Sequence, residues 1–452
     1  MSDASSPGAV TPNILDVCRT SFQADPLARV ARNAVARTDV RQVAMNRDAV
    51  AAISHTYSHT VATGKSTAQN SSGRCWMFAG LNLFRMKAAA VLGVEDFELS
   101  QNYLMFWDKF EKANYFLESI LSTLSEPQGS RLIDWLCASP LQDGGQWDMF
   151  VNLIEKYGVV PKETMPETHS SSNSGVMNGL ITLKLRQAAH ELRAAHASGE
   201  SAAQLRSRKD AVLPAIYRML ATHLGEPPSQ FHWQWRDKDK LFHRAGDITP
   251  QQFYNQFVGT DLHEMVCLIH CPQDSKQFHR LYTVGYLGNV VGGYPVRYLN
   301  VPMQTLKDAT VAMVRDGKPV WFGCDVGKMF DRDLGTMDLS LYEYDTLYGT
   351  NLGLDKAARL DYGQSLMTHA MVLAGVDIDD HGNPVKWRVE NSWGEAGGDK
   401  GFMSMTDAWF DEFLYEVVVD RRHVPAEVIA LLDTDPAILD PWDPMGSLAV
   451  AP

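Results

Sequence analysis

The sequence predicts a two-lobed α+β fold, with helices in the front half of the chain and short strands in the back half. Apolar residues recur at helical spacing after Cys75, and residues 177–225 are rich in the helix formers Ala, Leu, Arg and Gln. From about residue 263, short apolar runs alternate with turn residues, which is typical of strands. Two lobes of different construction leave a cleft where they meet, so residues that carry chemistry are expected near that junction.

The helices of the front half are expected over residues 75–92, 101–124 and 147–157. Gly93 is the expected stop of the first helix, and Ser71 or Ser72 is its expected cap. A polar break at residues 166–176 precedes the second helical stretch, at 177–225.

The strands of the back half are expected over residues 265–269, 296–299, 319–322, 370–374, 386–389 and 415–419. These elements divide the chain into five segments. They are an N-terminal segment (1–60), a helical lobe with Cys75 (61–165), a helical insertion (166–262), a strand-rich lobe with His369 and Asn391 (263–430) and a C-terminal arm (431–452).

The charge and the cysteines restrict the class of protein. A net charge of -13 argues against a nucleic-acid or anionic-membrane partner, because phosphates are bound by clustered cations. The six cysteines are scattered through a long chain, without the density of a disulfide framework. The first residues lack the features of a secretory signal, and no segment has the length of a membrane span. We therefore expect a reducing, cytoplasmic location.

Cys75 is the candidate nucleophile. A free thiol has a pKa of about 8.5, so it is mostly protonated near neutral pH. A position in the first turn of a helix favours the thiolate through the helix dipole, and a nearby imidazolium favours it further. The alternative is a buried structural cysteine, but the polar loop before Cys75 and the helix after it favour a nucleophile.

His369 and Asn391 are the candidates for the base and for the residue that orients it. Alone, His369 would be interpreted as a core histidine and Asn391 as a turn or capping residue. A turn at residues 381–384 would make their two strands neighbours, so that an amide oxygen can fix the imidazole tautomer. Trp393 then shields that hydrogen bond from water.

Gln69 is the candidate donor to the oxyanion. Its side-chain amide, with the backbone N–H of Cys75, can stabilise the negative oxygen of a tetrahedral intermediate. The alternative is a solvated loop glutamine, so this role depends on the neighbouring residues.

Longer motifs accompany these residues, namely Ser71–Trp76, Ser100–Leu104 with Phe106–Lys109, Asp143–Met149, Glu155–Gly158, Trp321–Lys328, Val389–Gly394 and Trp442–Gly446. On these motifs, the chain resembles the bleomycin hydrolase / aminopeptidase C family of papain-like cysteine peptidases, and the resemblance covers the chain from about residue 45 to the tail. The resemblance implies a papain-like fold with a helical lobe and a β-barrel-like lobe. It also implies that Cys75 is the nucleophile, His369 the general base and acid, Asn391 the orienting residue and Gln69 the oxyanion donor.

The spacing of the catalytic residues departs from secreted papain-like enzymes. His369 lies 294 positions after Cys75, whereas the usual separation is roughly 130–150 residues. The extra residues include the helical stretch at 177–225. By resemblance, such insertions build a homohexamer whose active sites face an inner channel. Ser72 stands where secreted papains usually carry a disulfide-forming cysteine, in agreement with a reducing compartment.

Residues 441–449 resemble the family's C-terminal arm, which lies in the active-site cleft. There the terminal carboxylate holds the α-ammonium of the substrate, which implies aminopeptidase action. The expected substrate contacts are Trp76, Trp393, Leu448 and Ala449. Because this chain continues to Pro452, we expect trimming near Ala449 or a shifted tail. The alternative is a frayed polar end.

Other interpretations remain to be weighed. A metal site at His263, Cys267, His270 and Cys271 fits no zinc spacing, and strand alternation separates Cys267 from His270. No metal and no cofactor are therefore expected. The expected function is a cytoplasmic thiol aminopeptidase that acts on short peptides, and on bleomycin-like amides in addition. Alternatives are a hydrolase or acyl transferase for non-peptide amides or thiolactones, and a nucleic-acid-binding role.

Overall fold

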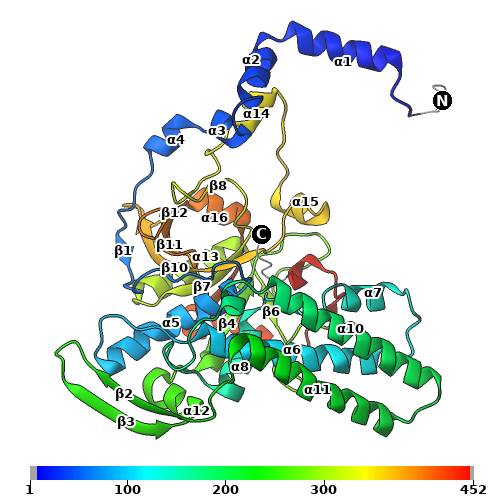
Figure 1. Ribbon diagram of the computed structural model, residues 1–452. Helices are drawn as coiled ribbons and strands as arrows, with labels where there is room; N and C mark the ends of the chain where they lie inside the picture. Colours follow the sequence, from blue (N-terminus) through cyan, green and yellow to red (C-terminus); the bar gives the residue numbers. More distant parts are fainter. Residues whose placement is uncertain (1–7, 448–452) are drawn as a thin grey trace.

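The structure is a computed structural model that describes residues 8–447. Its N-terminal segment contains α1 (Pro12–Ala24), α2 (Pro26–Val35), α3 (Val40–Ala44), α4 (Arg47–Ala51) and β1 (His59–Thr60). Helices α1 and α2 form an arm that projects from the body of the molecule at the top of Figure 1. Neither helix has a buried residue, so the arm packs little against the rest of its own chain.

The front lobe contains α5 (Cys75–Leu92), α6 (Gln101–Ser122), α7 (Arg131–Ala138) and α8 (Trp147–Tyr157). Gly93 ends α5 in the left-handed conformation, at φ 68°, as expected from the sequence. The expected cap is wrong: Arg74 occupies the N-cap position and makes no side-chain cap. The Ser72 hydroxyl instead donates to the Gln69 carbonyl, at 2.7 Å, because the loop before α5 folds back on itself.

The insertion contains α9 (His169–Ser172), α10 (Gly175–Ala197), α11 (Ala202–Leu224), β2 (Phe231–Arg236), β3 (Phe242–Ile248) and α12 (Pro250–Phe253). Helices α10 and α11 lie beside α6, where helix was expected (Figure 1). The hairpin β2–β3 was missed. Trp233 and Trp235 alternate with polar residues and pack against Phe253 and Phe257, so a period of two held the signal.

The strand-rich lobe is one mixed sheet in the order β14-β5-β6-β4-β13-β7-β10-β11-β12-β9-β8, with β1 beside β10. Its strands are β4 (Met265–Ile269), β5 (Arg280–Val284), β6 (Tyr298–Asn300), β7 (Val320–Cys324), β8 (Phe330–Asp331), β9 (Thr336–Met337), β10 (His369–Ile378), β11 (Pro384–Glu390), β12 (Phe402–Thr406), β13 (Leu414–Asp420) and β14 (Ala437–Leu439). The helices of this part are α13 (Met303–Arg315), α14 (Tyr344–Tyr348), α15 (Lys356–Asp361), α16 (Asp407–Phe413) and α17 (Ala426–Ile429). Every strand expected from the sequence overlaps one of these.

The central strands of the sheet separate two hydrophobic cores. Ala370 and Val372 of β10 belong to the core shared with the front helices, whereas Met371 and Leu373 belong to the core on the other face. This alternation follows from the two-residue period of a strand. It places the start of β10 directly behind the start of α5, where the two lobes meet. Among residues 8–447, no helix combines the length and apolarity that crossing a membrane requires.

Candidate active site

Cys75 is the first residue of α5 and lies at the junction of the two lobes. Its side chain is 1% exposed, and its Sγ accepts a hydrogen bond from the N–H of Ala370, at 3.4 Å. Burial raises the pKa of the Cys75 thiol to about 12. Burial therefore outweighs the helix start in this structure, and a base must take the thiol proton when the sulfur reacts.

His369 begins β10, and its ring is oriented by Asn391, which follows β11. The Nε2 of His369 lies 2.9 Å from the Oδ1 of Asn391. Because an amide oxygen only accepts, Nε2 carries the hydrogen and Nδ1 holds the lone pair. The Nδ1 atom is buried and has no hydrogen-bond partner among residues 8–447. Burial lowers the pKa of His369 to about 4, so the imidazole is neutral and able to accept a proton.

Trp393 covers this hydrogen bond, as its position in the sequence predicts. Its ring centroid lies 4.9 Å from that of His369. The Cζ of Arg332 lies 5.0 Å from the centroid of the Trp393 ring, in a cation–π contact. Asn391 also accepts the N–H of Ser392, at 2.7 Å. The amide and the imidazole are therefore both fixed in orientation.

Gln69 is brought to the same site by the 391–393 segment. Its Oε1 accepts from the Ser392 hydroxyl at 2.7 Å, and its Nε2 donates to the Ser72 carbonyl at 2.7 Å. The Gln69 side chain is buried, and its Nε2 retains a second N–H. That N–H can serve an oxyanion, provided that the reacting oxygen lies in front of the loop.

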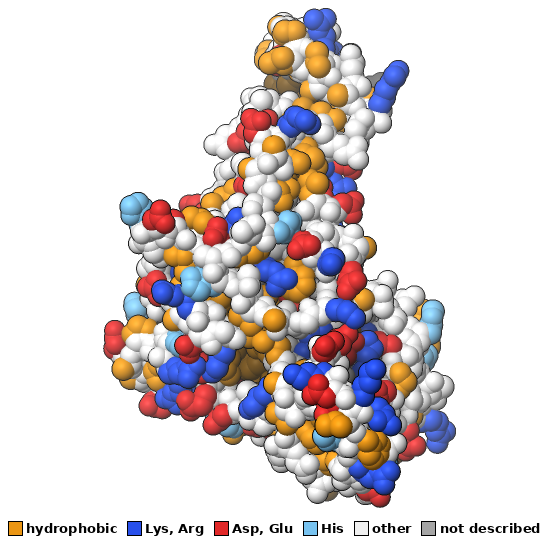
Figure 2. Space-filling view, turned by 90° about the vertical axis from the view of Figure 1, so that its left-hand side faces the viewer, with side chains coloured by type: hydrophobic (Ala, Val, Ile, Leu, Met, Phe, Trp, Pro, Cys, Tyr) orange, Lys and Arg blue, Asp and Glu red, His pale blue; other side chains and the backbone are white. Residues whose placement is uncertain are grey.

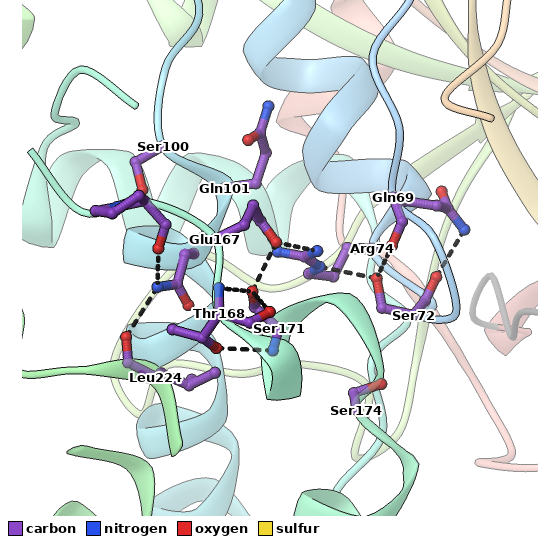
Figure 3. Close-up of polar contacts among 12 residues, drawn as sticks. Gln69, Ser72, Arg74, Ser100, Gln101, Glu167, Thr168, Ser171, Ser174 and Leu224 are labelled. Atoms are coloured by element: carbon purple, nitrogen blue, oxygen red, sulfur yellow. Dashed lines mark hydrogen bonds and ion pairs between the residues drawn. The ribbon is translucent and has the colours of Figure 1, made fainter. Parts of the chain in front are cut away.

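The loop before Cys75 is held by residues that sequence reasoning missed. Both carboxylate oxygens of Glu167 bind the guanidinium of Arg74, at 3.0 and 2.7 Å, and the Ser171 hydroxyl donates to the same carboxylate at 2.6 Å. Figure 3 shows Arg74 between Ser72 and Glu167. The Ser71 N–H donates to Ser172 at 2.9 Å. The start of the insertion thus braces the catalytic loop, and only the three-dimensional approach of distant segments reveals this.

Asp143 forms a second brace from the other side. It accepts the Gly73 N–H at 2.9 Å and pairs with the buried Lys109 ammonium at 2.5 Å. Burial acts to raise the pKa of Asp143, but the Lys109 charge outweighs it and holds that pKa well below its usual range. The Trp76 indole donates to the Asp143 carbonyl at 2.8 Å. The motif that begins at Asp143 therefore fixes both the loop and the first turn of α5.

A cavity of about 1140 Å³ opens beside this loop. Its walls include residues 69–73, Asp143 with Gly144, residues 330–333 and Trp393. The volume and the mixed polar lining suit a peptide rather than a single small ion.

The C-terminal arm reaches the site. The Ser447 hydroxyl donates to the carbonyl of Met367, at 2.9 Å, two residues before His369. The Ser447 carbonyl accepts from the Gln146 amide, at 2.7 Å. Further back, Asp443 pairs with Lys276 at 3.0 Å. The last described residue of the chain is thus anchored two residues before the strand that carries the base.

The comparisons with known proteins agree with this geometry. The model of the Peptidase C1-like family matches residues 9–446. The chain belongs to this family. It is 46% identical over 429 residues to Aminopeptidase C of Listeria monocytogenes, covering 95% of this chain and 96% of that protein. It is 44% identical over 437 residues to bleomycin hydrolase of Rattus norvegicus, covering 95% and 96%.

The solved structures agree as well. The crystal structure of PepW from Lactobacillus rhamnosis HN001 has a TM-score of 0.96 and 47% sequence identity, covering 98% of this chain and 100% of that one. The expected resemblance, the papain-like α+β fold and the class of enzyme, a cysteine-type peptidase, are therefore confirmed.

Within this family fold, the expected substrate contacts lie in different places. Trp393 lines the cavity. Trp76 is 0% exposed and packs inside the core of the front lobe. Leu448 and Ala449 lie outside the residues that the structure describes.

The residues considered for a metal site lie in structural contacts. His263 pairs with Glu155 at 2.7 Å, and His270 bonds the Val301 carbonyl at 3.0 Å. Cys324 is fully buried and lies opposite His369 in the sheet. Within residues 8–447, no group of three or more His, Cys, Asp and Glu residues is arranged to hold a metal ion.

Proposed function

We propose that this protein is a thiol aminopeptidase that removes N-terminal residues from short peptides. The observation that carries the proposal is the position of the C-terminal arm. Its residue Ser447 is anchored at Met367, next to the buried His369–Asn391 pair. We propose that an arm in that place limits the substrate to one residue before the bond to be cut. The relatives named Aminopeptidase C support the same activity.

The proposed mechanism starts from the protonation states of the substrate-free site, a neutral Cys75 thiol and a neutral His369 imidazole. As the Cys75 sulfur attacks the peptide carbonyl carbon, the neutral His369 takes the thiol proton at Nδ1. The imidazolium then gives this proton to the leaving amine, and the C–N bond breaks to leave a thioester on Cys75. Water, deprotonated by His369, hydrolyses the thioester and regenerates the thiol. Asn391 keeps the ring in one tautomer throughout.

The oxyanion of each tetrahedral intermediate is proposed to lie between two donors. One is the backbone N–H of Cys75, and the other is the free Nε2–H of Gln69. Fixed donors in a buried site stabilise the developing charge without rearranging. The contacts of Gln69 with Ser72 and Ser392 support this role, because they leave the amide no other orientation.

The arm is proposed to act as the ruler. Leu448 and Ala449 would continue from Ser447 towards the nucleophile, and a terminal carboxylate there would pair with the substrate α-ammonium. The residues up to Pro452 would crowd this place, so we propose that the enzyme trims its tail near Ala449. A shifted tail is the alternative.

The substrates are proposed to be unblocked short peptides. Relatives named bleomycin hydrolase add bleomycin-like amides as a further class. Non-peptide amides and thiolactones remain the alternative, since the same thioester chemistry would act on them. A nucleic-acid-binding role has less support, because the net charge is -13.

A reducing compartment, the cytoplasm, is proposed as the location. All six cysteines are free in the structure, and the nucleophile must stay reduced to react.

Self-association, with a homohexamer as the expected state, is proposed for the projecting arm of α1 and α2. Val17, Leu27 and Val30 on this arm are 62%, 74% and 65% exposed. Figure 2 shows apolar side chains along the arm at the top of the view. We propose that a second copy of this chain covers these exposed apolar side chains. Sedimentation velocity of the wild type and of Leu27→Glu tests it, and a monomeric wild type would contradict it.

The proposed activity is tested with an aminoacyl coumarin amide and its N-acetylated twin. We expect the wild type to hydrolyse the unblocked amide and to leave the acetylated one intact. Cys75→Ala should lose the activity. Equal rates on both substrates would refute the aminopeptidase, and an active Cys75→Ala would refute the nucleophile. Hydrolysis rates of homocysteine thiolactone distinguish the proposed peptidase from the alternative enzyme that acts on thiolactones.

A further inference from the structure

Arg332 presents a guanidinium to the active-site cavity without an acidic partner. It lies in the turn between β8 and β9 and lines the cavity beside the catalytic loop. Among residues 8–447, no Asp or Glu side chain forms an ion pair with it. Its guanidinium has one described hydrogen bond, in which Nη2 donates to the Trp393 carbonyl at 3.4 Å. A guanidinium has five N–H donors, so most of them are left for a ligand.

The other charged side chains of the cavity are engaged within the protein, apart from one. The charged residues of its lining are Asp39, Arg41, Asp143, Asp331, Arg332 and Asp333. Arg41 pairs with Asp39 at 3.0 Å, and Asp143 pairs with the buried Lys109. Asp331 accepts the N–H groups of the two residues at the tip of the turn, at 3.0 and 2.9 Å. Asp333 is exposed. The described part of the cavity thus offers one cation without a partner.

The guanidinium of Arg332 has a fixed place against the wall of the cavity. Its Cζ lies 5.0 Å from the centroid of the Trp393 ring, which also lines the cavity. The Arg332 carbonyl packs against Gly397, whose missing side chain leaves room for this close approach. The Asp331 carboxylate caps the turn from within. A guanidinium that is already positioned loses less freedom when a ligand binds.

The distance from the catalytic base to Arg332 suits one amino acid. The ring centroids of His369 and Trp393 are 4.9 Å apart, so the Cζ of Arg332 is no more than about 10 Å from the centre of the imidazole. The leaving amine must lie about 3 Å from Nδ1 of His369 to take its proton. The α-carboxylate of the same leaving residue reaches up to about 3.6 Å beyond that nitrogen. A charged hydrogen bond of about 2.8 Å then completes the span.

We propose that Arg332 binds the α-carboxylate of the amino acid that is released, so that dipeptides with a free C-terminus are preferred substrates. The planar fork of the guanidinium matches the two oxygens of a carboxylate. The released residue lies along Trp393, between the imidazole and the guanidinium. The inference rests on the proposed function, because it names the substrate class of that same site.

The test compares three substrates that share their first residue, namely Ala-Leu, Ala-Leu amide and Ala-Glu amide. The first carries an α-carboxylate, the second carries no carboxylate, and the third carries one on its side chain. Each is assayed as kcat/KM with the full chain as wild type, Arg332→Gln and Arg218→Gln. Arg218 is the matched control, because it is exposed on α11, outside the lining of the cavity.

We expect the ratio of Ala-Leu to Ala-Leu amide to be about fivefold lower in Arg332→Gln than in the wild type, and unchanged in Arg218→Gln. Effects of a substitution on Cys75 or His369 cancel in this ratio, because both substrates use the same nucleophile and base. An unchanged ratio in a folded Arg332→Gln overturns the inference. A loss confined to the ratio of Ala-Glu amide to Ala-Leu amide overturns it as well, because Arg332 would then bind an acidic side chain.

Ionic strength gives a second readout that needs no variant. Salt screens the attraction between Arg332 and the carboxylate, so the wild-type ratio of Ala-Leu to Ala-Leu amide should fall between about 0.01 M and 1 M salt. Screening of the net charge of -13 alone would raise this ratio, because an acidic protein repels the free dipeptide more than its amide. A constant or rising ratio overturns the inference, even where Arg332→Gln does not fold.

Two further results separate the inference from the activity on which it rests. A wild type that hydrolyses an unblocked aminoacyl coumarin amide but does not cleave Ala-Leu overturns the dipeptide preference alone. A wild type that hydrolyses no unblocked aminoacyl amide refutes the proposed function itself, and the inference with it.

Discussion

Glu167 holds Arg74, the residue before the nucleophile, with both carboxylate oxygens, at 3.0 and 2.7 Å. The Arg74 side chain is 1% exposed and that of Glu167 is 21% exposed, so water screens the pair only weakly. Its backbone is the N-cap of the catalytic helix. The contact therefore transmits the position of the insertion to the start of α5.

Removing one charge of this pair should slow catalysis more than it weakens substrate binding. In Glu167→Gln the loop loses its fixed position, and we expect kcat to fall about tenfold with a smaller change in KM, since misplaced reacting groups lower the rate. The assay is run well below the melting temperature, so that unfolding does not contribute. Glu200→Gln is the matched control, because Glu200 binds Arg208 by the same fork, at 2.6 and 2.6 Å, on the surface of the insertion. A loss of similar size in the control would contradict the brace.

Removing the amide of Gln69 should lower kcat with little change in KM. Loss of one oxyanion donor costs roughly 100-fold in kcat, because the donor acts on charge that exists only in the transition state. Gln69→Ala, compared with the exposed Gln187→Ala, measures this directly. An unchanged kcat would remove Gln69 from the oxyanion hole.

Glu390 gives a prediction for stability against pH. Burial raises the pKa of this carboxyl to about 7, although Arg85 binds it at 2.6 Å. A carboxyl whose pKa is higher in the folded state stabilises the fold most below its unfolded pKa of about 4.3. That contribution is lost as the pH rises through 7, and it amounts to up to about 3 kcal/mol.

Urea unfolding of the wild type and of Glu390→Gln at pH 5 and pH 7.5 measures the effect. We expect the free energy of unfolding of the wild type to decrease between these pH values relative to that of the variant. A constant difference between the two proteins would show that Glu390 has no raised pKa.

The tail gives a prediction for covalent structure. If the enzyme trims itself near Ala449, the intact mass of the purified protein is lower than that of the full sequence by the residues after the cut. Cys75→Ala, purified in the same way, should retain the full mass. A full-length wild-type protein with full activity would exclude trimming.

The sequence predicted the parts of the site that depend on local pattern. The helix after Cys75, the strand that begins at His369, the strand that ends before Asn391, and the contact of Trp393 with His369 all follow from periodicity and short spacings. The ion pair of Glu167 with Arg74 could not be predicted, because a lone carboxylate in a polar stretch has the same local pattern whether it is buried or solvated.

The predicted N-cap of α5 was wrong for a different reason. Serines before a helix favour the N-cap, but here the loop turns inward, and Ser72 serves the Gln69 carbonyl and the Arg74 guanidinium. The functional loop overrides the local preference. The hairpin β2–β3 was missed because all of residues 166–262 were assigned to a helical insertion, although Trp233 and Trp235 alternate with polar residues.

The most direct test is to trap the acyl-enzyme. The protein is mixed with an unblocked aminoacyl p-nitrophenyl ester, quenched in acid, digested and examined by mass spectrometry. We predict that the peptide containing Cys75 gains the mass of the aminoacyl group, and that the corresponding peptide of Cys75→Ala does not. An acyl group found on another residue, or on Cys75→Ala, would contradict the assignment of Cys75 as the nucleophile.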